Sequence, residues 1–233
     1  MYLADIDAAL RMFGPRFVQI YGQGECPMTI TVLPRNLLAD ATHPNAASRR
    51  ASVGFAQAGM TVRVVDAQMH EVPCGAVGQI VVAGDAVMKG YWRNPGATAE
   101  AIVEGWLCTG DLGSVDSDGF VTLTDRSKDV IISGGTNIYP REVEEALLAH
   151  DLVFEASVIG MPSAEWGEEV IAFIVPIKGA SLAAGTLDEW CKSRIASFKK
   201  PKRYYMVPDL PKNSYGKILK TDLRIQAKLQ PEG

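Results

Sequence analysis

Cysteine is scarce in this sequence. Its four cysteines, Cys26, Cys74, Cys108 and Cys191, are scattered along 233 residues. They form no CxxC pair and stand near no cluster of histidines, which argues against a zinc site and against a disulfide framework. Four reduced thiols are therefore expected, and reduced thiols are typical of proteins that stay in the cytoplasm.

Long apolar runs and an excess of positive charge are also missing. No apolar stretch approaches the about 18 residues that a membrane-spanning helix needs, and the N-terminus has no basic flank before an apolar stretch, as a secretion signal would. The net charge is -4, whereas nucleic-acid-binding proteins usually carry a positive field. These absences predict a soluble, cytoplasmic protein with no transmembrane segment and no nucleic-acid partner.

The apolar sequence that is present can form a core, because 47% of the residues are hydrophobic. The length suits two modest domains. Apolar residues at helical spacing predict an amphipathic helix over residues 3–13. Two short β-rich runs at 17–21 and 28–33 follow, and residues 34–52 are polar and irregular. The chain is thus expected to open with one helix and two strands.

The pattern changes near Arg126. Between residues 53 and 125, short β-rich runs alternate with Gly, Pro, Asn and Asp clusters, which is typical of a small barrel or sandwich. Beyond this point helical and strand patterns alternate over about 105 residues, a normal size for an α+β domain. The predicted elements there are strands at 129–132, 156–159, 170–176 and 204–207, a helix from Pro140 through Ala149, a helix from a Thr186 cap to about Ala196, and a final basic helix. We therefore place a domain boundary between residues 127 and 128.

Five segments carry candidate functional residues. In chain order they read YGQGE (21–25), VMKGYW (87–92, within 78–102), GWLCTGDLG (105–113), DRSKDVIISGGTNIYP (125–140) followed by EVEE (142–145), and PKNSYGKILK (211–220). Taken alone, several of them have an ordinary structural interpretation: a glycine loop after a strand is common, TGD can be a turn capped by its Asp, and a charged junction can be a solvated linker. The aromatic residues of the second segment are expected to pack rather than react. The fixed order of the five segments is the stronger signal.

This ordered set resembles the signatures of the adenylate-forming superfamily, which contains acyl- and aryl-CoA synthetases, luciferases and the adenylation domains of peptide synthetases. The resemblance implies the C-terminal part of such an enzyme, with an α/β and α+β fold class. Residues 1–127 would be a remnant of the large AMP-binding domain, mainly its β-barrel subdomain, and residues 128–233 a mobile α+β lid. The SGGxNIYPxEVE form is closer to acyl- and aryl-CoA synthetases than to peptide-synthetase domains, which favours coenzyme A as the acceptor.

The resemblance also implies nucleotide-binding residues. The residues that would contact ATP or AMP are Tyr21, Gly22, Gln23, Asp111 and Arg126. Asp111 would accept hydrogen bonds from the ribose hydroxyls, which suits a carboxylate with two oxygens. Glu25 would hold the Mg²⁺ that bridges the ATP phosphates, because Mg²⁺ prefers hard carboxylate oxygens. Gly24 stands where the family has threonine, so one contact to the α-phosphate is missing.

In the second half of the chain, Lys217 matches the catalytic lysine of the family and Lys128 matches its hinge. A compact ammonium on a long stem suits the bridging of an attacking carboxylate and an α-phosphate, and hinges are a few residues at the ends of elements. The implied coenzyme A contacts are Gly134, Gly135, Trp166, Phe198, Lys200 and Lys202. The alternative for the two aromatic residues is packing at the surface, and for the basic excess between residues 192 and 220 it is a solvated face.

One family feature is missing, because no TSGTTGxPK-like loop occurs in these 233 residues. A cradle of backbone N–H groups is not replaced by scattered side chains. The predicted function is ATP-dependent activation of a small-molecule carboxylic acid and thioester formation with CoA, by a chain expected to be inactive alone. A non-catalytic remnant that binds nucleotide or CoA, or an adenylating enzyme with a carrier-protein acceptor, stays open. Residues 1–45 are expected to expose an apolar face, which leaves a homo-oligomer open.

Overall fold

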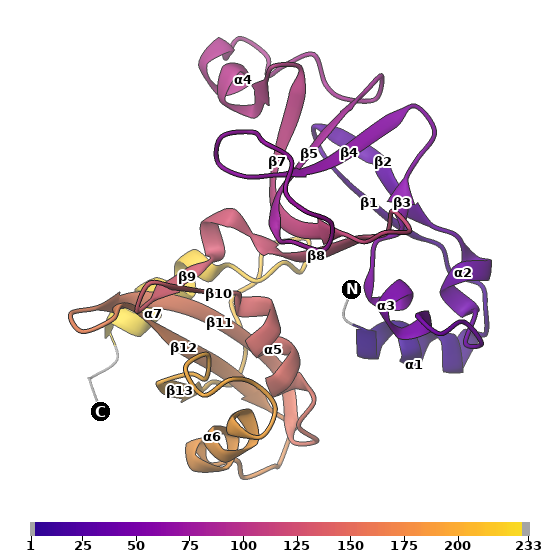
Figure 1. Ribbon diagram of the computed structural model, residues 1–233. Coiled ribbons are helices and arrows are strands. Elements are labelled where there is room, and N and C mark those ends of the chain that lie inside the picture. The colour runs from indigo at the N-terminus through magenta and orange to yellow at the C-terminus, as the bar shows by residue number, and fades with distance from the viewer. Residues whose placement is uncertain (1–2, 230–233) are drawn as a thin grey trace. The chain divides into compact units, whose positions relative to one another are not determined.

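The computed structural model describes residues 3–229. The chain forms two compact units, Met1–Ser127 and Lys128–Gly233 (Figure 1). Within the described residues, no helix is both long enough and apolar enough to cross a membrane.

The first unit begins with the predicted helix, α1 (Leu3–Phe13), and a three-stranded antiparallel sheet. The strands are β1 (Gln19–Gln23), β2 (Cys26–Leu33) and β3 (Phe55–Ala56), in the order β1-β2-β3. The helix and both predicted strands are therefore confirmed, with β1 starting two residues later than expected.

The prediction of an irregular segment over residues 34–52 is wrong. This segment contains two short helices, α2 (Arg35–Ala39) and α3 (Ala46–Ala51). Each helix is too short to be stable by its own propensity. Helix α2 buries Leu38, and α3 buries Ala46. Leu38 packs with Ile6, Leu33 and Phe120. Tertiary packing therefore stabilises helices that local sequence does not show.

A second antiparallel sheet follows within the first unit. Its strands are β4 (Met60–Val65), β5 (Gly78–Gly84), β6 (Ile102–Val103), β7 (Trp106–Val115) and β8 (Val121–Arg126), with the order β4-β5-β7-β6 and β8 paired with β7. A buried cluster joins Tyr21 and Ile30 of the first sheet to Ile80 and Leu107 of the second. Two antiparallel sheets that share one core are the arrangement expected of a small barrel or sandwich.

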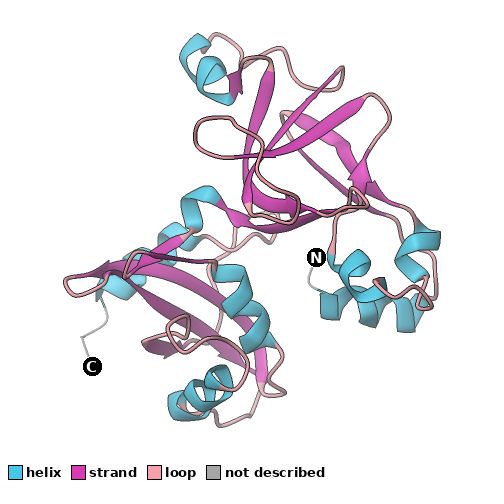
Figure 2. Cartoon of the chain, viewed as in Figure 1, coloured by secondary structure: helices cyan, strands magenta, loops and turns pink. Residues whose placement is uncertain are grey.

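One helix interrupts the region that was predicted to be entirely β. This helix is α4 (Pro95–Ala101), one of the helices coloured cyan in Figure 2. The Oδ1 of Asn94, the residue before it, accepts the Ala97 N–H at 3.1 Å. Asn at the cap with Pro at the first helical position is a local helix-start signal. The all-β prediction is corrected here by a signal that was present in the sequence.

The second unit is a mixed sheet covered by helices. The boundary between the units falls within η1 (Ser127–Asp129). The later elements are β9 (Ile131–Ser133), β10 (Thr136–Ile138), α5 (Pro140–Leu148), β11 (Val153–Ser163), β12 (Gly167–Pro176), α6 (Ala184–Lys192), β13 (Arg203–Met206) and α7 (Lys220–Leu229). The strand order is β10-β9-β12-β11, and β13 pairs parallel with β12. Pro140 is the first residue of α5, as predicted.

Three predicted boundaries in the second unit are wrong. The helix expected to run to about Ala196 ends at Lys192. The strand expected from residue 129 begins at Ile131, because residues 127–129 form a 3-10 turn. Helix α6 begins at Ala184, so Thr186 lies inside it and is not its cap. The N–H groups of Thr186 and Leu187 donate to the Ala183 carbonyl at 3.1 and 3.4 Å. Backbone hydrogen bonds thus define this helix start, without a capping side chain.

Strand β12 explains why the second unit has a core on both faces of its sheet. Successive side chains of a strand point to opposite faces. Val170, Ala172 and Ile174 join the cluster that contains α5 and α6 residues, and the alternate residues join the cluster of α7. The continuous apolar run of this strand is therefore buried on both sides.

Candidate functional site

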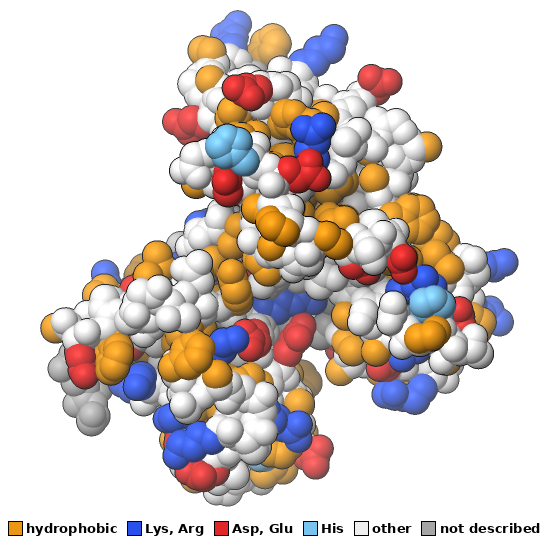
Figure 3. Space-filling model, viewed as in Figure 1, with side chains coloured by type: hydrophobic (Ala, Val, Ile, Leu, Met, Phe, Trp, Pro, Cys, Tyr) orange, Lys and Arg blue, Asp and Glu red, His pale blue; other side chains and the backbone are white. Residues whose placement is uncertain are grey.

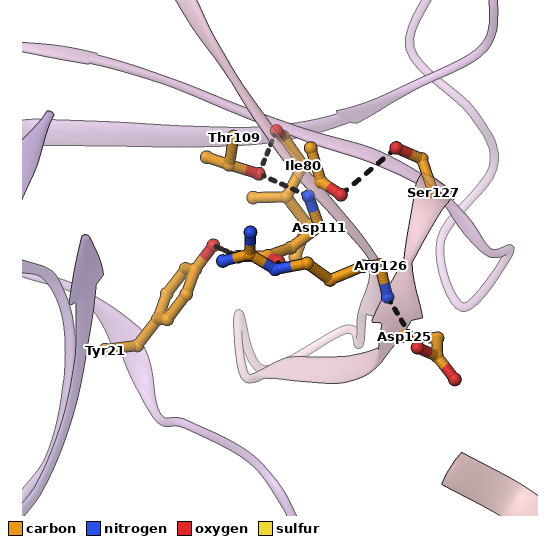
Figure 4. Close-up of polar contacts among 8 residues, drawn as sticks. Tyr21, Ile80, Thr109, Asp111, Asp125, Arg126 and Ser127 are labelled. Atoms are coloured by element: carbon orange, nitrogen blue, oxygen red, sulfur yellow. Dashed lines mark hydrogen bonds and ion pairs between the residues drawn. The ribbon is translucent and has the colours of Figure 1, made fainter. Parts of the chain in front are cut away.

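A polar cluster around a buried carboxylate joins three strands of the first unit (Figure 4). The Tyr21 hydroxyl on β1 donates to Asp111 Oδ2 on β7 at 2.6 Å, and Arg126 Nε on β8 lies 3.0 Å from Asp111 Oδ1. Asp111 and Arg126 are partners in the register of β7 and β8. The structure thus brings together three of the residues predicted to bind nucleotide.

Thr109 orients the Asp111 main chain from the same face of β7. Both residues are buried, because side chains two apart on a strand share a face. The Thr109 hydroxyl donates to the Ile80 carbonyl at 2.7 Å and accepts the Asp111 N–H at 3.1 Å. Sequence reasoning missed this role for Thr109, although the residue lies inside the third motif.

The electrostatics of the cluster keep Tyr21 protonated. Burial, and then the hydrogen bond to the Asp111 carboxylate, raise the pKa of Tyr21 far above its ordinary value of 10.0. The phenol therefore stays a donor, and the carboxylate is compensated by Tyr21 and by the Arg126 guanidinium.

Asp111 retains room for further donors. An ionised carboxylate has about four lone-pair sites, and the Tyr21 and Arg126 contacts use one on each oxygen. The Arg126 side chain is 41% exposed, so solvent reaches the cluster on that side. Two neighbouring hydroxyls of a ligand are a group that this arrangement can bind.

The remaining residues of the first motif form a tight hairpin. A Cβ on Gly22 would lie 2.3 Å from Met28 N and 2.7 Å from Cys26 O. The hairpin itself therefore requires glycine at this position. Gln23 pairs with Cys26 at the end of the hairpin, and Glu25 lies in the turn that connects β1 and β2.

Glu25 has a partner that the sequence did not suggest. The Tyr91 hydroxyl donates to Glu25 Oε1 at 2.6 Å across 66 positions of sequence. This hydrogen bond raises the pKa of Tyr91. Tyr91 is 40% exposed, so its ring is only partly packed, and its hydroxyl is engaged with Glu25.

Glu25 has the chemistry that Mg²⁺ requires. It is a half-buried carboxylate in a turn. Among residues 3–229 no group of three or more His, Cys, Asp or Glu side chains forms a metal cage. Mg²⁺ commonly binds through one or two carboxylates together with substrate phosphates and water, and Glu25 fits this type of site.

In the second unit, Lys217 extends from a loop organised by Asn213. The Asn213 side chain accepts the N–H groups of Tyr215 and Lys217 at 3.0 and 2.9 Å, and its main-chain N–H donates to the Lys217 carbonyl at 2.9 Å. Gly216 supplies a φ of +78°. The loop therefore has a defined backbone, while the Lys217 side chain is exposed.

The Gly134-Gly135 turn is closed against Trp166. Both glycines have positive φ, 57° and 77°. The Gly134 N–H donates to the Trp166 carbonyl at 2.8 Å, and a Cβ on Gly134 would lie 3.0 Å from the Trp166 ring. Lys202 Nζ lies 5.4 Å from the centre of the same ring. Four of the residues predicted to contact coenzyme A are thus neighbours or near neighbours.

The other predicted residues of this unit lie apart from that group or are already engaged. Lys200 forms an ion pair with Asp188. Phe198 is 51% exposed, with Lys199 Nζ 5.9 Å from its ring centre. Lys128 is exposed within η1. On the face shown in Figure 3, acidic and basic side chains are interspersed.

Two family models match the chain. The AMP-binding enzyme model matches residues 3–92, and the AMP-binding enzyme C-terminal domain model matches residues 142–217. The chain belongs to the family of AMP-binding, adenylate-forming enzymes, as the ordered motifs predicted.

Individual relatives are ligases. The chain is 40% identical over 219 residues to the fatty acid–[acyl-carrier-protein] ligase ScoC of Streptomyces coeruleorubidus, with 94% of this chain and 41% of that protein covered. It is 40% identical over 221 residues to feruloyl-CoA synthase of an Amycolatopsis species, with 95% and 43% covered. The chain spans about 40% of the length of these relatives.

A solved structure supports the fold. ATP-bound MatB from Rhodopseudomonas palustris matches with a TM-score of 0.88 and 35% identity, over 97% of this chain and 44% of MatB. The predicted fold class is confirmed by this likeness.

Proposed function

We propose that this chain is the C-terminal part of an acyl-CoA synthetase. The enzyme would join a carboxylic acid to ATP, giving an acyl-adenylate and pyrophosphate, and then transfer the acyl group to the thiol of coenzyme A with release of AMP. Family membership supports the reaction class. The observation that carries the proposal is the Tyr21–Asp111–Arg126 cluster, because its carboxylate retains acceptor sites for a pair of hydroxyls such as those of ribose.

In the first step, the residues of the first unit bind and orient the nucleotide. Asp111 accepts from the ribose hydroxyls and Arg126 neutralises that carboxylate beside them. Glu25 is the proposed Mg²⁺ ligand, and the ion supplies charge neutralisation for the phosphates when bound. Lys217 meets the negative charge that grows on the α-phosphate, as a compact point charge can.

In the second step, residues of the second unit bind coenzyme A. The Gly134-Gly135 turn offers a backbone without side chains to a narrow ligand chain. Trp166 and Lys202 offer an aromatic face and a cation for an adenine and a phosphate. Lys200 takes part only after Asp188 releases it, so its contribution is expected to be smaller than that of Lys202.

A carrier-protein acceptor is the second candidate. ScoC, which matches over nearly the whole chain, is named as a ligase for an acyl-carrier protein, whereas feruloyl-CoA synthase is named for CoA. The Gly134, Trp166 and Lys202 group favours CoA, because a small phosphorylated ligand with an adenine suits it. The proposed compartment is the cytoplasm, in keeping with four free cysteines.

The nucleotide site is tested first on the 233-residue chain. We expect AMP to bind detectably in ligand-observed NMR and the affinity to fall at least about tenfold in Asp111→Asn, since a charge-assisted contact is lost. Asp118→Asn, a carboxylate at a surface ion pair with Arg49, is the matched control. Unchanged AMP binding in Asp111→Asn would show that the ribose contact is assigned wrongly.

The reaction is tested in a fusion of this chain to the N-terminal part of MatB. We expect pyrophosphate release that depends on a carboxylic acid, and AMP release that rises with added CoA. The 233-residue chain alone should release no pyrophosphate, because its sequence contains no phosphate-binding glycine loop. A folded fusion that activates no acid from a broad panel would overturn the proposed reaction.

A further inference from the structure

The segment before α4 holds the Glu25 turn at two points. The Met88 N–H donates to the Glu25 carbonyl at 2.7 Å, and the Tyr91 hydroxyl donates to Glu25 Oε1 at 2.6 Å. The first contact fixes the main chain of the turn. The second fixes the direction of the carboxylate, which would otherwise rotate freely on its stem.

Tyr91 is itself fixed by the first turn of α4. Its N–H donates to the Thr98 hydroxyl at 2.9 Å, and that hydroxyl donates to the Asn94 carbonyl at 2.8 Å. Gly90 has a φ of +149°, and a Cβ there would lie 2.7 Å from Thr98 Cγ2. The chain therefore approaches α4 as closely as only glycine permits, and the tyrosine projects from a rigid support.

Packing does not account for this arrangement. Tyr91 is 40% exposed, and its neighbour Trp92 is 87% exposed, so neither ring fills the core. The polar contact to Glu25 is the feature that a rigid, half-exposed tyrosine provides here. Carboxylates that bind metal ions are usually hydrogen-bonded by such outer partners, whose loss typically lowers metal affinity by about 10- to 100-fold.

We infer that Tyr91 is a positioning residue for Glu25. Its phenol holds Oε1, so that Oε2 is presented to a divalent cation. This inference rests on the proposed function, in which Glu25 is the Mg²⁺ ligand. It adds a residue from the second motif to the metal site and gives α4 a role as the support of that residue.

The test uses Mn²⁺ as a paramagnetic probe of the 233-residue chain. Mn²⁺ broadens the NMR signals of nearby amides even when it binds weakly. The Mn²⁺ concentration at which the Glu25 amide signal loses half of its intensity therefore measures the affinity for Mn²⁺ at this turn. We expect this concentration to rise by about 10- to 100-fold in Tyr91→Phe. Trp92→Phe, a change to the adjacent exposed ring, should leave it unchanged.

Glu25→Gln separates the inference from the function on which it rests. The metal role of Glu25 and the positioning role of Tyr91 both stand if Glu25→Gln abolishes local broadening and Tyr91→Phe weakens it. Two further results are required: Tyr91→Phe has no additional effect in the Glu25→Gln background, and it leaves the melting temperature unchanged. If Glu25→Gln abolishes broadening while Tyr91→Phe matches the unaltered chain, the positioning role is wrong and the metal role stands. If the unaltered chain shows no broadening near Glu25, or Glu25→Gln does not change it, both are wrong.

Discussion

At the residue scale, the buried Asp111 carboxylate depends on its two partners. Asp111 is 8% exposed, and a buried charge is costly unless it is paired and hydrogen-bonded. Tyr21 and Arg126 provide that compensation from two other strands. The same contacts that stabilise the fold therefore also shape the proposed ribose site.

Tyr21→Phe tests the stabilising part of this arrangement. The loss of one donor to a buried carboxylate should cost about 1 to 3 kcal/mol of unfolding free energy at pH 7. Because the pKa of Tyr21 is raised in the folded state, its contribution is full below pH about 10 and falls as the pH rises above that value. In denaturant unfolding measured from pH 7 to 11, the free energy of unfolding should therefore fall less steeply with rising pH in Tyr21→Phe than in the unaltered chain.

Tyr215→Phe is the control for this measurement, because Tyr215 is 94% exposed. The pKa of Tyr204 is also raised by burial, so part of the alkaline decline remains in every variant. Identical slopes for Tyr21→Phe and the unaltered chain would contradict the assigned role of the Tyr21 phenol.

Lys217→Ala tests the proposed catalytic lysine in the MatB fusion. Acyl-adenylate formation should fall by a factor of about 10² to 10³, the usual effect of losing one preorganised charge. Thioester formation from supplied acyl-adenylate should stay near normal, because the α-phosphate is attacked only in the first step. Lys178→Ala, an exposed lysine elsewhere in the same unit, is the control, and equal losses in both steps would refute this division of labour.

At the element scale, charged pairs anchor the helix that follows the Lys217 loop. Lys220 Nζ, at the start of α7, lies 3.0 Å from Glu144 Oε1 on α5. The same oxygen accepts the Val158 N–H of β11 at 2.9 Å. Arg224, one turn further along α7, lies 3.3 Å from Asp129 of η1. Two of the three lysines in the last motif therefore differ, since Lys220 is held in an ion pair and Lys217 is exposed.

Lys220→Met tests this difference. Lys220→Met removes the Lys220 ammonium from the Glu144 carboxylate, whose side chain is 8% exposed. The lost charged contact to a buried group should lower the free energy of unfolding by about 1 to 3 kcal/mol. Lys217→Ala should change stability by less than about 0.5 kcal/mol. Amide exchange of the β12 core residues measures the stability change in each variant. Combining Glu144→Gln with Lys220→Met should recover part of the stability that Lys220→Met alone loses. A neutral Lys220→Met would mean that the pair contributes no net stability.

At the scale of the whole molecule, the chain consists of two units with separate cores, and η1 lies where they join. The resemblance to the family predicts that Lys128 is a hinge, and we propose this role for it. Rotation there would let Lys217 serve the first step and the Gly134-Gly135 turn the second, as hinge motions in enzymes commonly do.

Lys128→Pro tests this rotation in the MatB fusion. Proline fixes φ near −65° and removes the N–H, so we expect slower thioester formation with adenylation nearly unchanged, the reverse of Lys217→Ala. Lys128→Ala, which keeps the backbone free, should behave as the unaltered enzyme. If Lys128→Pro slows both steps equally, the two units do not alternate about this residue.

Much of this protein could be read from its sequence because the signals were local or ordered. Helical spacing predicted α1, proline at a helix start predicted α5, and the order of five motifs identified the family. The Asn94-Pro95 start of α4 was equally local and was overlooked. These features depend on residues a few positions apart, whose geometry the backbone alone determines.

Only the tertiary structure decided which distant residues contact one another. Neither the hydrogen bond from Tyr91 to Glu25 nor the ion pair between Lys200 and Asp188 follows from any local pattern. Helix α2 is stabilised by the packing of Leu38 in a buried cluster, and α3 buries Ala46. Sequence determined which groups are present and their order. Folding determined which of them meet, because contacts between distant residues depend on how strands register and cores fill, and local propensity does not encode either.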